Sequence, residues 1–199
     1  LAFLIGFAFA GAGSRFIDRS DLIIKEANAL GTAYLRADAV DAAQRGALKA
    51  VIKEYTADRV RLLDSADSTE IERLLGRVGG LQQKMWRLRL EGSGASPQLM
   101  QLVLPSINAV IDLHTTHLYT AHRHLPPAIM AVLLGIAAVG FGLVGFNGGH
   151  TGQRFLGLDM LYGAVLATGL WMVIDLDFPR MGVIRLDNAP LIAALQSMG

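Results

Sequence analysis

The sequence has no cysteine, and few of its residues are charged. Without cysteine the chain forms no disulfide framework, holds no cysteine-ligated iron–sulfur cluster and carries no thiol nucleophile. Charged side chains make up 18% of the 199 residues and nearly cancel to a net charge of +1, a balance that does not suggest a nucleic-acid binder. Hydrophobic residues make up 52%, and the mean hydropathy is +0.41. This composition excludes a disordered chain, because disorder requires low hydrophobicity and a high net charge.

The apolar residues are concentrated in three blocks, Leu1–Gly13, Ala128–Phe146 and Phe155–Leu176. The second block is uncharged, and the third contains only Asp159 and Asp175, near its two ends. Each of these two blocks is long enough to cross a membrane as a helix, which takes roughly 20 residues. The first block is shorter, and we interpret it as the C-terminal part of a membrane helix whose beginning is absent. A signal peptide is the alternative, although no basic segment precedes the block.

The second and third blocks are joined by Asn147–Arg154, whose residues favour a turn, so residues 126–177 are predicted to form an antiparallel transmembrane hairpin. Basic residues near the ends of the three blocks lie mainly on one side of the predicted membrane, and the hairpin turn contributes only Arg154. The positive-inside rule therefore places the intervening segment, residues 14–125, and the C-terminal segment, residues 178–199, in the cytoplasm. The basic residues on that side are Arg15, Arg19, Lys25, Arg123, Arg180 and Arg185.

The intervening segment, residues 14–125, holds 15 of the 18 basic and 13 of the 17 acidic side chains. Its apolar residues recur with the 3.6-residue period of helices and nowhere alternate as in strands. A helix is predicted over residues 18–38, with one apolar stripe and one polar stripe, and a second helix over residues 40–63. The predicted apolar stripes are Ile23, Ala27, Leu30 and Tyr34 in the first helix, and Ala43, Ala47, Val51 and Tyr55 in the second.

Two further helices are expected before the second apolar block. Asp67 is predicted to cap the third helix, with Glu70 in the capping-box position relative to it. Ser96–Pro97 is predicted to start the fourth helix, which Pro105 either kinks or begins. The expected fold class is therefore an all-α integral membrane protein, with membrane helices and a cytoplasmic antiparallel helical bundle.

Four histidines lie close together shortly before the second apolar block. His114 and His117 are three residues apart, a spacing that places both on one helix face, as two-histidine metal sites require. Such a site needs a further ligand, and Asp112 lies on a different face. Because His114 also falls on the apolar face of its helix, a packed imidazole is favoured, and no metal or cofactor is expected. His122 and His124 are expected at the level of the lipid headgroups.

A group of charged residues follows the third apolar block, in the segment IDLDFPRMGVIRL. Carboxylates at the end of a membrane helix are unfavourable unless they are paired or hydrated. Asp175, Asp177, Arg180 and Arg185 are therefore expected to form ion pairs with one another at the interface, and Pro179 is expected to end the helix. A direct role in conduction is the alternative for these residues.

The segment Glu26–Ala37 carries a second polar pattern at the predicted cytoplasmic mouth of the first apolar block. Asn28, Thr32 and Arg36 follow one another at intervals of four residues and share a helix face. Gly31 allows close approach of another helix, as small residues do in tightly packed membrane proteins. Asn28, Thr32 and Arg36 are candidates for lining a pore, and an ordinary solvated face is the alternative. No phosphate loop, nucleophile elbow or dinucleotide fingerprint is present, so no enzyme is predicted.

Three segments resemble the bacterial bestrophin-like membrane proteins: EANALGTAYLRAD at residues 26–38, RHLPPAIMAVLL at residues 123–134 and LWMVIDLDFPRMGVIRL at residues 170–186. The resemblance extends from about residue 7 to residue 191. It implies four membrane helices, cytoplasmic termini and a helical insertion after the second helix. The positions that match the family pattern are Glu26, Asn28, Gly31, Thr32, Arg36, Pro126, Asp175, Asp177, Pro179 and Arg180.

The resemblance implies a relation to bestrophins, which are oligomeric anion channels with a central pore. The chain lacks the aromatic-flanked Asn-Pro motif that bestrophins carry at the pore neck, so chloride selectivity and pentameric assembly do not follow from it. The expected function is a homo-oligomeric ion channel, leaning toward anions, in the bacterial inner membrane. A non-conducting scaffold or accessory subunit of a larger membrane complex is the alternative. The expected partners are the lipid bilayer and further copies of the chain, and no nucleic acid.

Overall fold

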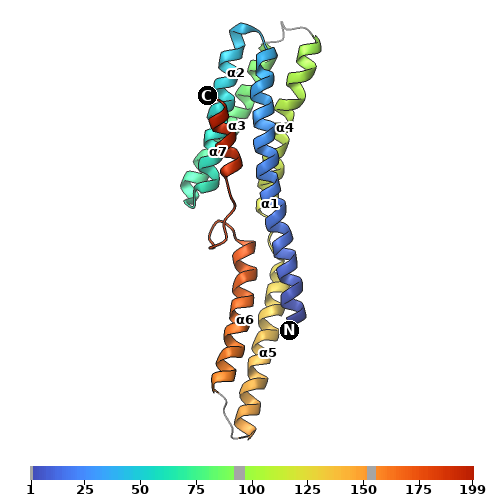
Figure 1. Ribbon diagram of the computed structural model, residues 1–199, viewed down its shortest axis with the longest axis vertical. Helices are drawn as coiled ribbons and strands as arrows, with labels where there is room; N and C mark the ends of the chain where they lie inside the picture. Colours follow the sequence, from blue (N-terminus) through green and yellow to red (C-terminus); the bar gives the residue numbers. More distant parts are fainter. Residues whose placement is uncertain (1, 92–96, 152–155) are drawn as a thin grey trace. The chain divides into compact units, whose positions relative to one another are not determined.

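The computed structural model describes residues 2–91, 97–151 and 156–199, and the regular elements of these residues are all helical (Figure 1). Helix α1 is one continuous helix, although it starts as an apolar segment and ends as a charged one. No proline interrupts it, and its residues form one helix from Ala2 to Arg36. The elements in chain order are α1 (Ala2–Arg36), a short 3-10 helix η1 (Ala37–Ala39), α2 (Ala42–Asp64), α3 (Ser68–Glu91), α4 (Pro97–Ala121), α5 (Pro127–Thr151), α6 (Leu156–Asp177) and α7 (Ala189–Ser197).

The chain divides into two compact units. The first, here called the hairpin unit, consists of Leu1–Asp18 and Arg123–Arg185. The second, the bundle unit, consists of Arg19–His122 and Leu186–Gly199. The C-terminal segment that the sequence groups together, residues 178–199, is therefore divided between the units at Arg185, and α7 belongs to the bundle unit.

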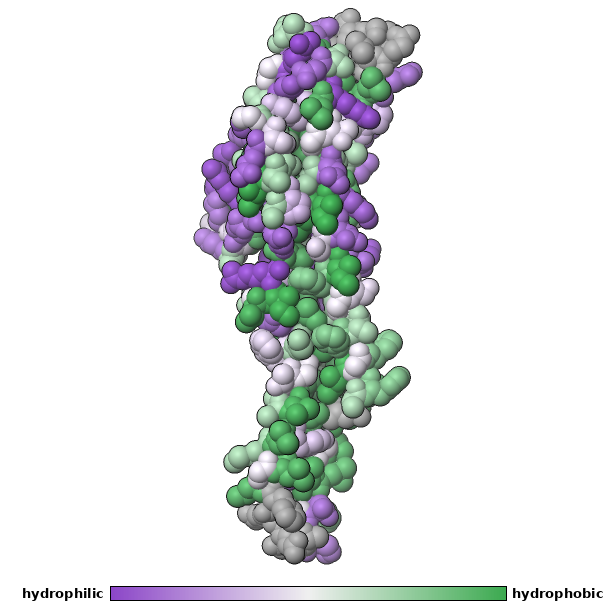
Figure 2. Space-filling model, in the orientation of Figure 1, coloured by the Kyte–Doolittle hydropathy of each residue, from purple (hydrophilic) through white to green (hydrophobic). Residues whose placement is uncertain are grey.

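The hairpin unit contains the two described helices that are long and apolar enough to cross a membrane, Pro127–His150 in α5 and Leu156–Asp177 in α6. Both present large apolar side chains to the outside, and Figure 2 shows hydrophobic residues gathered over them. A small core joins them to the first part of α1. Its buried members are Ala8, Ala12, Leu125, Leu133, Val173 and Leu176.

Helix α5 is longer than its apolar block predicts. Residues Asn147–Arg154 are expected to form the hairpin turn, but α5 continues as a helix to Thr151 despite Gly148 and Gly149. The prediction of an eight-residue turn is therefore wrong at its N-terminal side, and Gly152 to Arg154 lie outside the described residues. At the end of an apolar helix, continued hydrogen bonding within the backbone outweighs the weak helix preference of glycine.

The bundle unit has a larger core, formed by the inner faces of α1 to α4 and α7. The predicted stripe of α1 is confirmed, since Ile23, Ala27 and Leu30 are buried. The stripe of α2 is only half right, because Ala43 and Ala47 are exposed at its start. From Leu48 onward the buried face of α2 carries larger side chains: Leu48, Val51, Ile52, Tyr55, Arg59 and Leu62.

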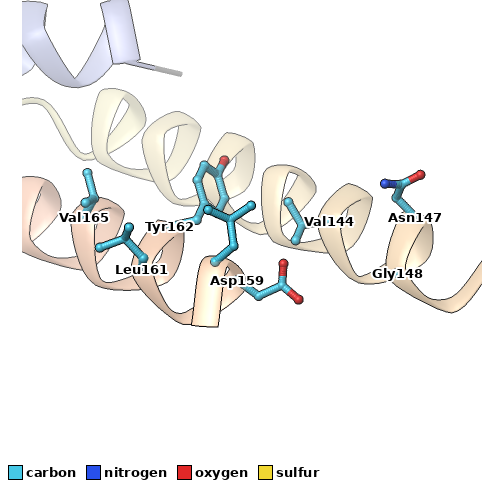
Figure 3. A pocket seen from close by; sticks show the side chains of 8 residues that line it. Val144, Asn147, Gly148, Asp159, Leu161, Tyr162 and Val165 are labelled. Carbon is cyan, nitrogen blue, oxygen red and sulfur yellow. The ribbon is translucent and has the colours of Figure 1, made fainter. Parts of the chain in front are cut away.

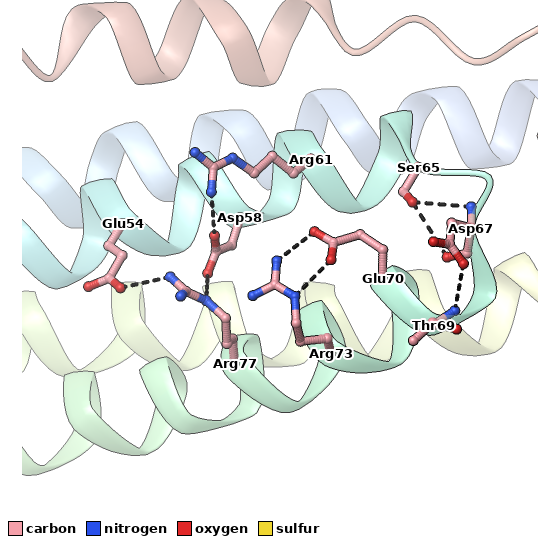
Figure 4. Close-up of polar contacts among 9 residues, drawn as sticks. All are labelled: Glu54, Asp58, Arg61, Ser65, Asp67, Thr69, Glu70, Arg73 and Arg77. Atoms are coloured by element: carbon pink, nitrogen blue, oxygen red, sulfur yellow. Dashed lines mark hydrogen bonds and ion pairs between the residues drawn. The ribbon is translucent and has the colours of Figure 1, made fainter.

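The start of α3 confirms one predicted cap and corrects another (Figure 4). The Asp67 carboxylate accepts the backbone N–H of Thr69 at 3.0 Å, as expected for an N-cap residue. Glu70 does not complete a capping box. Its carboxylate accepts two hydrogen bonds from Arg73, at 2.7 and 2.5 Å, and the Ser65 hydroxyl accepts the N–H of Asp67 instead. A charged partner one turn away competes successfully for the carboxylate.

Helix α7 packs on the bundle through apolar and polar contacts. Leu191 and Met198 are buried in the bundle core. The Tyr34 hydroxyl donates to the carbonyl of Met198 at 2.6 Å, and Asn188 bonds to Asp64. These contacts thus hold α7, the segment that follows α6, in the bundle unit.

Candidate functional site

The second half of α1 has one buried and one exposed face, and the exposed face carries the predicted pore candidates. Asn28, Thr32 and Arg36 are all exposed, as is Lys25 one turn before them. On the opposite face the side chains are buried against the rest of the bundle unit, namely those of Ile23, Glu26, Ala27, Leu30 and Ala33. The structure therefore brings the three candidates together on one strip of the surface.

Of the three candidates, Arg36 alone makes a side-chain hydrogen bond to its own bundle within the described residues. Its guanidinium donates to the carbonyl oxygen of Leu102 in α4 at 3.1 Å. The bond leaves the positive charge without a carboxylate partner among the described side chains, since the neighbouring Asp38 lies 2.7 Å from the ammonium of Lys49. Arg36 is thus an exposed, positioned cation at the end of α1.

Beneath this exposed strip, Glu26 is held by a fully buried arginine. Its side chain is 0% exposed, and Arg59 of α2 is 1% exposed. The guanidinium donates two hydrogen bonds to the carboxylate, at 2.5 and 2.7 Å. A bidentate arginine–carboxylate pair of this kind is the strongest contact that the two groups make, and it holds α1 against α2.

Three further ionisable side chains surround this ion pair. The His117 Nδ1 atom lies 3.4 Å from a Glu26 oxygen. Burial opposes ionisation of Glu26, but Arg59 and then His117 outweigh it and lower the pKa of the carboxyl to about 2. Burial, and then the charge of Arg59, lowers the pKa of His114 to about 4, so this imidazole is neutral at pH 7. Burial also raises the pKa of Tyr55, whose ring lies edge-on to His114 with centroids 6.2 Å apart.

The second buried carboxylate centre, around Asp177, lies in the hairpin unit. Arg15 of α1 donates to Asp177 at 2.9 Å, and the backbone N–H of Leu125 donates to its other oxygen at 2.8 Å. His124 lies 3.5 Å from the same oxygen and stacks on Phe178. Asp177 thus ties the start of the α5 segment and the α1 segment to the end of α6.

Asp175 is held without any charged partner, which corrects the prediction of an ion pair. Its two carboxylate oxygens accept the backbone N–H groups of Val183 and Ile184, each at 2.8 Å. Arg185 donates to the carbonyl of Gly182 rather than to an aspartate. The loop folds back so tightly that backbone donors reach the carboxylate first, and a Cβ atom on Gly182 would lie 2.5 Å from it.

The remaining positions of the family pattern shape the backbone or lie at the surface. The carbonyl of Pro126 accepts the N–H groups of Ile129 and Met130 and so starts α5. Helix α6 ends at Asp177, two residues before the buried Pro179, as predicted. Gly31 lies half-buried on α1 with no atom near its missing side chain. Arg180 is exposed.

The hairpin unit also has an open groove between α5 and α6, with a cavity of about 550 Å³ (Figure 3). Its walls are mainly apolar, and Asp159 is the one charged residue among the described residues that line it. The polar groups beside it are Asn147 and Tyr162. Within the described residues, no group of three or more histidine or acidic side chains is arranged to hold a metal ion.

Two site residues escaped the sequence analysis, namely Arg59 and Arg15, the partners of Glu26 and Asp177. Arg59 lies in the apolar stripe of α2, three to four residues from Tyr55 and Leu62, and an arginine in such a position is a signal of a buried partner. Arg15 is the first charge after an uncharged segment, but nothing local indicates that its partner is 162 residues away.

The arrangement defines a class of protein: an all-helical chain in which an apolar helical hairpin is combined with a charged helical bundle built around a buried ion pair. The chain belongs to the bestrophin-like domain family, whose pattern it matches over residues 1–191. The match confirms the resemblance drawn from the three segments and extends over both units. No curated protein and no solved structure shows a significant match.

Proposed function

We propose that this protein is a homo-oligomeric ion channel of a bacterial inner membrane, in which the exposed face of α1 lines an axial pore that favours anions. The observation that carries the proposal is the exposed polar strip of α1, Lys25, Asn28, Thr32 and Arg36, opposite a fully packed face. In oligomeric channels each subunit contributes the same polar residue to a ring around the symmetry axis, and such rings select the ion. Membership of the bestrophin-like domain family supports the same function.

A second strip on α1 supports oligomeric assembly. Ile24 and Leu35 are 45% and 70% exposed, and with Gly31 they share one helix face beside the polar strip. A helix that lines a pore must also contact its neighbours in the ring. An apolar strip with a glycine next to a polar strip meets both requirements, because small residues let helices approach closely.

The placement in the membrane is supported by α5 and α6. Large apolar side chains cover their outer faces, which suits contact with lipid rather than with a pore. Since α7 belongs to the bundle unit, the C-terminal helix and the insertion lie on one side of the membrane, and the positive-inside rule makes that side the cytoplasm.

The absence of cysteine allows a direct test of the pore. Thr32→Cys protein in liposomes should lose most of its chloride flux when a charged methanethiosulfonate reagent is added, because the modified side chain narrows the pore. Glu72→Cys, at an exposed position of α3, is the matched control and should keep its flux. Equal sensitivity of the two variants would contradict a pore along α1.

Selectivity is tested at Arg36. If its charge attracts anions, Arg36→Glu should shift the reversal potential in a salt gradient toward that of cations. Lys84→Glu, an equal change of charge at an exposed position of α3, should leave it unchanged. An unchanged reversal potential in Arg36→Glu would remove this residue from the selectivity role.

The second candidate function is a non-conducting scaffold within a larger membrane complex. The bond from Arg36 to the carbonyl of Leu102 favours it, because it engages the guanidinium with its own bundle. The exposed apolar strip of α1 would then contact a different protein. Silence in the flux assay, together with a stable heteromeric complex, would establish this alternative.

A further inference from the structure

Helices α3 and α4 border a second groove, which lies wholly in the bundle unit and away from α1. Its cavity has a volume of about 550 Å³, within the size range of pockets that hold small organic ligands. One face of α3 supplies most of the wall, and α4 supplies one residue. The lining residues are Gly79, Gln82, Gln83, Trp86, Arg87 and Ile111.

The floor of the groove is open because Gly79 has no side chain. A Cβ atom added there would meet no atom within 4 Å, so steric crowding does not require glycine at this position. Glycine weakens the interior of a helix relative to alanine. Its presence therefore has no local structural benefit, whereas it does leave space between the two helices.

The charge in the groove is unbalanced. Arg73 and Arg77, on the same helix, are paired with Glu70 and with Asp58 and Glu54 (Figure 4). Arg87 differs from them, since it makes no hydrogen bond or ion pair with the described part of the chain. Among the described residues that line the groove none is acidic, so the charge that they contribute is positive.

The groove also offers a flat apolar surface. The amide of Gln82 is not a free donor, because its buried Nε2 atom interacts with the hydroxyl of Tyr55 in the core. Beside Gln82, the indole of Trp86 and the side chain of Ile111 provide apolar area.

We propose that this groove binds a small aromatic anion. Its ring lies over Gly79 against Trp86 and Ile111, and its carboxylate or equivalent oxyanion pairs with Arg87. A ligand must have both a negative charge and a ring to use the whole groove. A guanidinium alone would bind any anion, and an indole alone would contact any apolar molecule. This site is separate from the proposed pore and does not depend on conduction.

Tryptophan fluorescence provides the test, because the chain has two tryptophans. In a Trp171→Phe background Trp86 is the only tryptophan of the chain, and excitation at a wavelength that tyrosine does not absorb selects its emission. The full chain in detergent micelles is titrated with 4-nitrobenzoate, a flat aromatic carboxylate that quenches indole fluorescence, and in parallel with neutral 4-nitrobenzamide. Saturable quenching by the carboxylate, with weaker binding of the amide, is the expected result. Quenching that stays linear with concentration for both compounds would overturn the proposal.

Two pairs of variants identify the groove as the site. Gly79→Leu should abolish the saturable component, whereas Gly80→Leu, at the next and exposed position, should retain it. Arg87→Gln should weaken binding of 4-nitrobenzoate about tenfold and leave the amide unaffected. If Gly79→Leu fails to fold, as judged by helicity, Arg87→Gln decides alone. Equal loss for both compounds, or no loss, would refute the assignment.

Discussion

Asp177 of the hairpin unit and Glu26 of the bundle unit are each at most 1% exposed, yet they are stabilised in different ways. Glu26 is paired with Arg59, which is just as deeply buried. Asp177 is paired with Arg15, whose side chain is 22% exposed, and it also accepts a backbone N–H group. The adjacent Asp175 relies on backbone N–H groups alone.

The difference predicts how each unit responds when a partner is lost. An exposed arginine that loses its carboxylate can turn to water, whereas a buried one leaves an uncompensated charge in an apolar core. The bundle unit therefore depends on both members of its ion pair at once. The hairpin unit distributes the same task over one partly hydrated cation and several backbone groups.

The largest effect is expected from breaking the buried pair. Arg59→Met should destabilise the protein by about 3–5 kcal/mol, because Glu26 then remains charged without its partner. The double variant Glu26→Gln/Arg59→Met should recover much of that loss. Chemical unfolding of the full chain in detergent measures both. A double variant that is no more stable than Arg59→Met would show that the two residues are not coupled.

The next effect concerns pH and is confined to the bundle unit. The pKa of His114 is about 4 in the fold against 6.5 in an ordinary setting, so the unfolded chain takes up this proton first as the pH falls. Stability should therefore be constant above pH 6.5 and decrease between pH 6.5 and 4, by about 2–3 kcal/mol. Protonation of Glu26 in the unfolded chain continues the loss below about pH 4.5.

His114→Gln is the variant that isolates this effect. It removes the titrating group, so the decrease between pH 6.5 and 4 should flatten while the loss below pH 4.5 remains. His122→Gln, at an exposed histidine, serves as the control and should follow the parent protein. A pH profile that His114→Gln leaves unchanged would contradict the role of His114.

A smaller effect is expected from Asp177→Asn in the hairpin unit. The variant loses the charge that pairs with Arg15 but can still accept the N–H of Leu125, and Arg15 can be hydrated. We expect a loss of about 1–2 kcal/mol, well below that of Arg59→Met. The same unfolding assay measures it. A loss as large as that of Arg59→Met would remove the distinction between the two centres.

The smallest of the four effects tests the backbone cage of Asp175. Gly182→Ala places a methyl group 2.5 Å from the Asp175 carboxylate and should destabilise the hairpin unit by about 1 kcal/mol, as the loop shifts to relieve the contact. Gly157→Ala in α6, where nothing lies within 4 Å, is the control and should be neutral or slightly stabilising. Similar thermal midpoints for both variants would argue against a tight loop.

Much of the fold was predictable because its signals are local. The apolar blocks that became α5 and α6, the stripe of α1 and the cap at Asp67 each depend on residues within a few turns of one another. The exposure of Asn28, Thr32 and Arg36 follows from the same helical period. Where two local partners competed, as for Glu70, the prediction failed, since spacing does not rank a capping bond against an ion pair.

The sequence by itself therefore determined the helices, their apolar faces and the family to which the chain belongs. Only the tertiary structure decided which buried groups meet. Arg59 reaches Glu26 across 33 residues and Arg15 reaches Asp177 across 162, while Asp175 takes backbone donors where arginines were expected. The physical reason is that helical periodicity is a property of a short segment, whereas the choice of a buried charge partner depends on which segments pack together and exclude water.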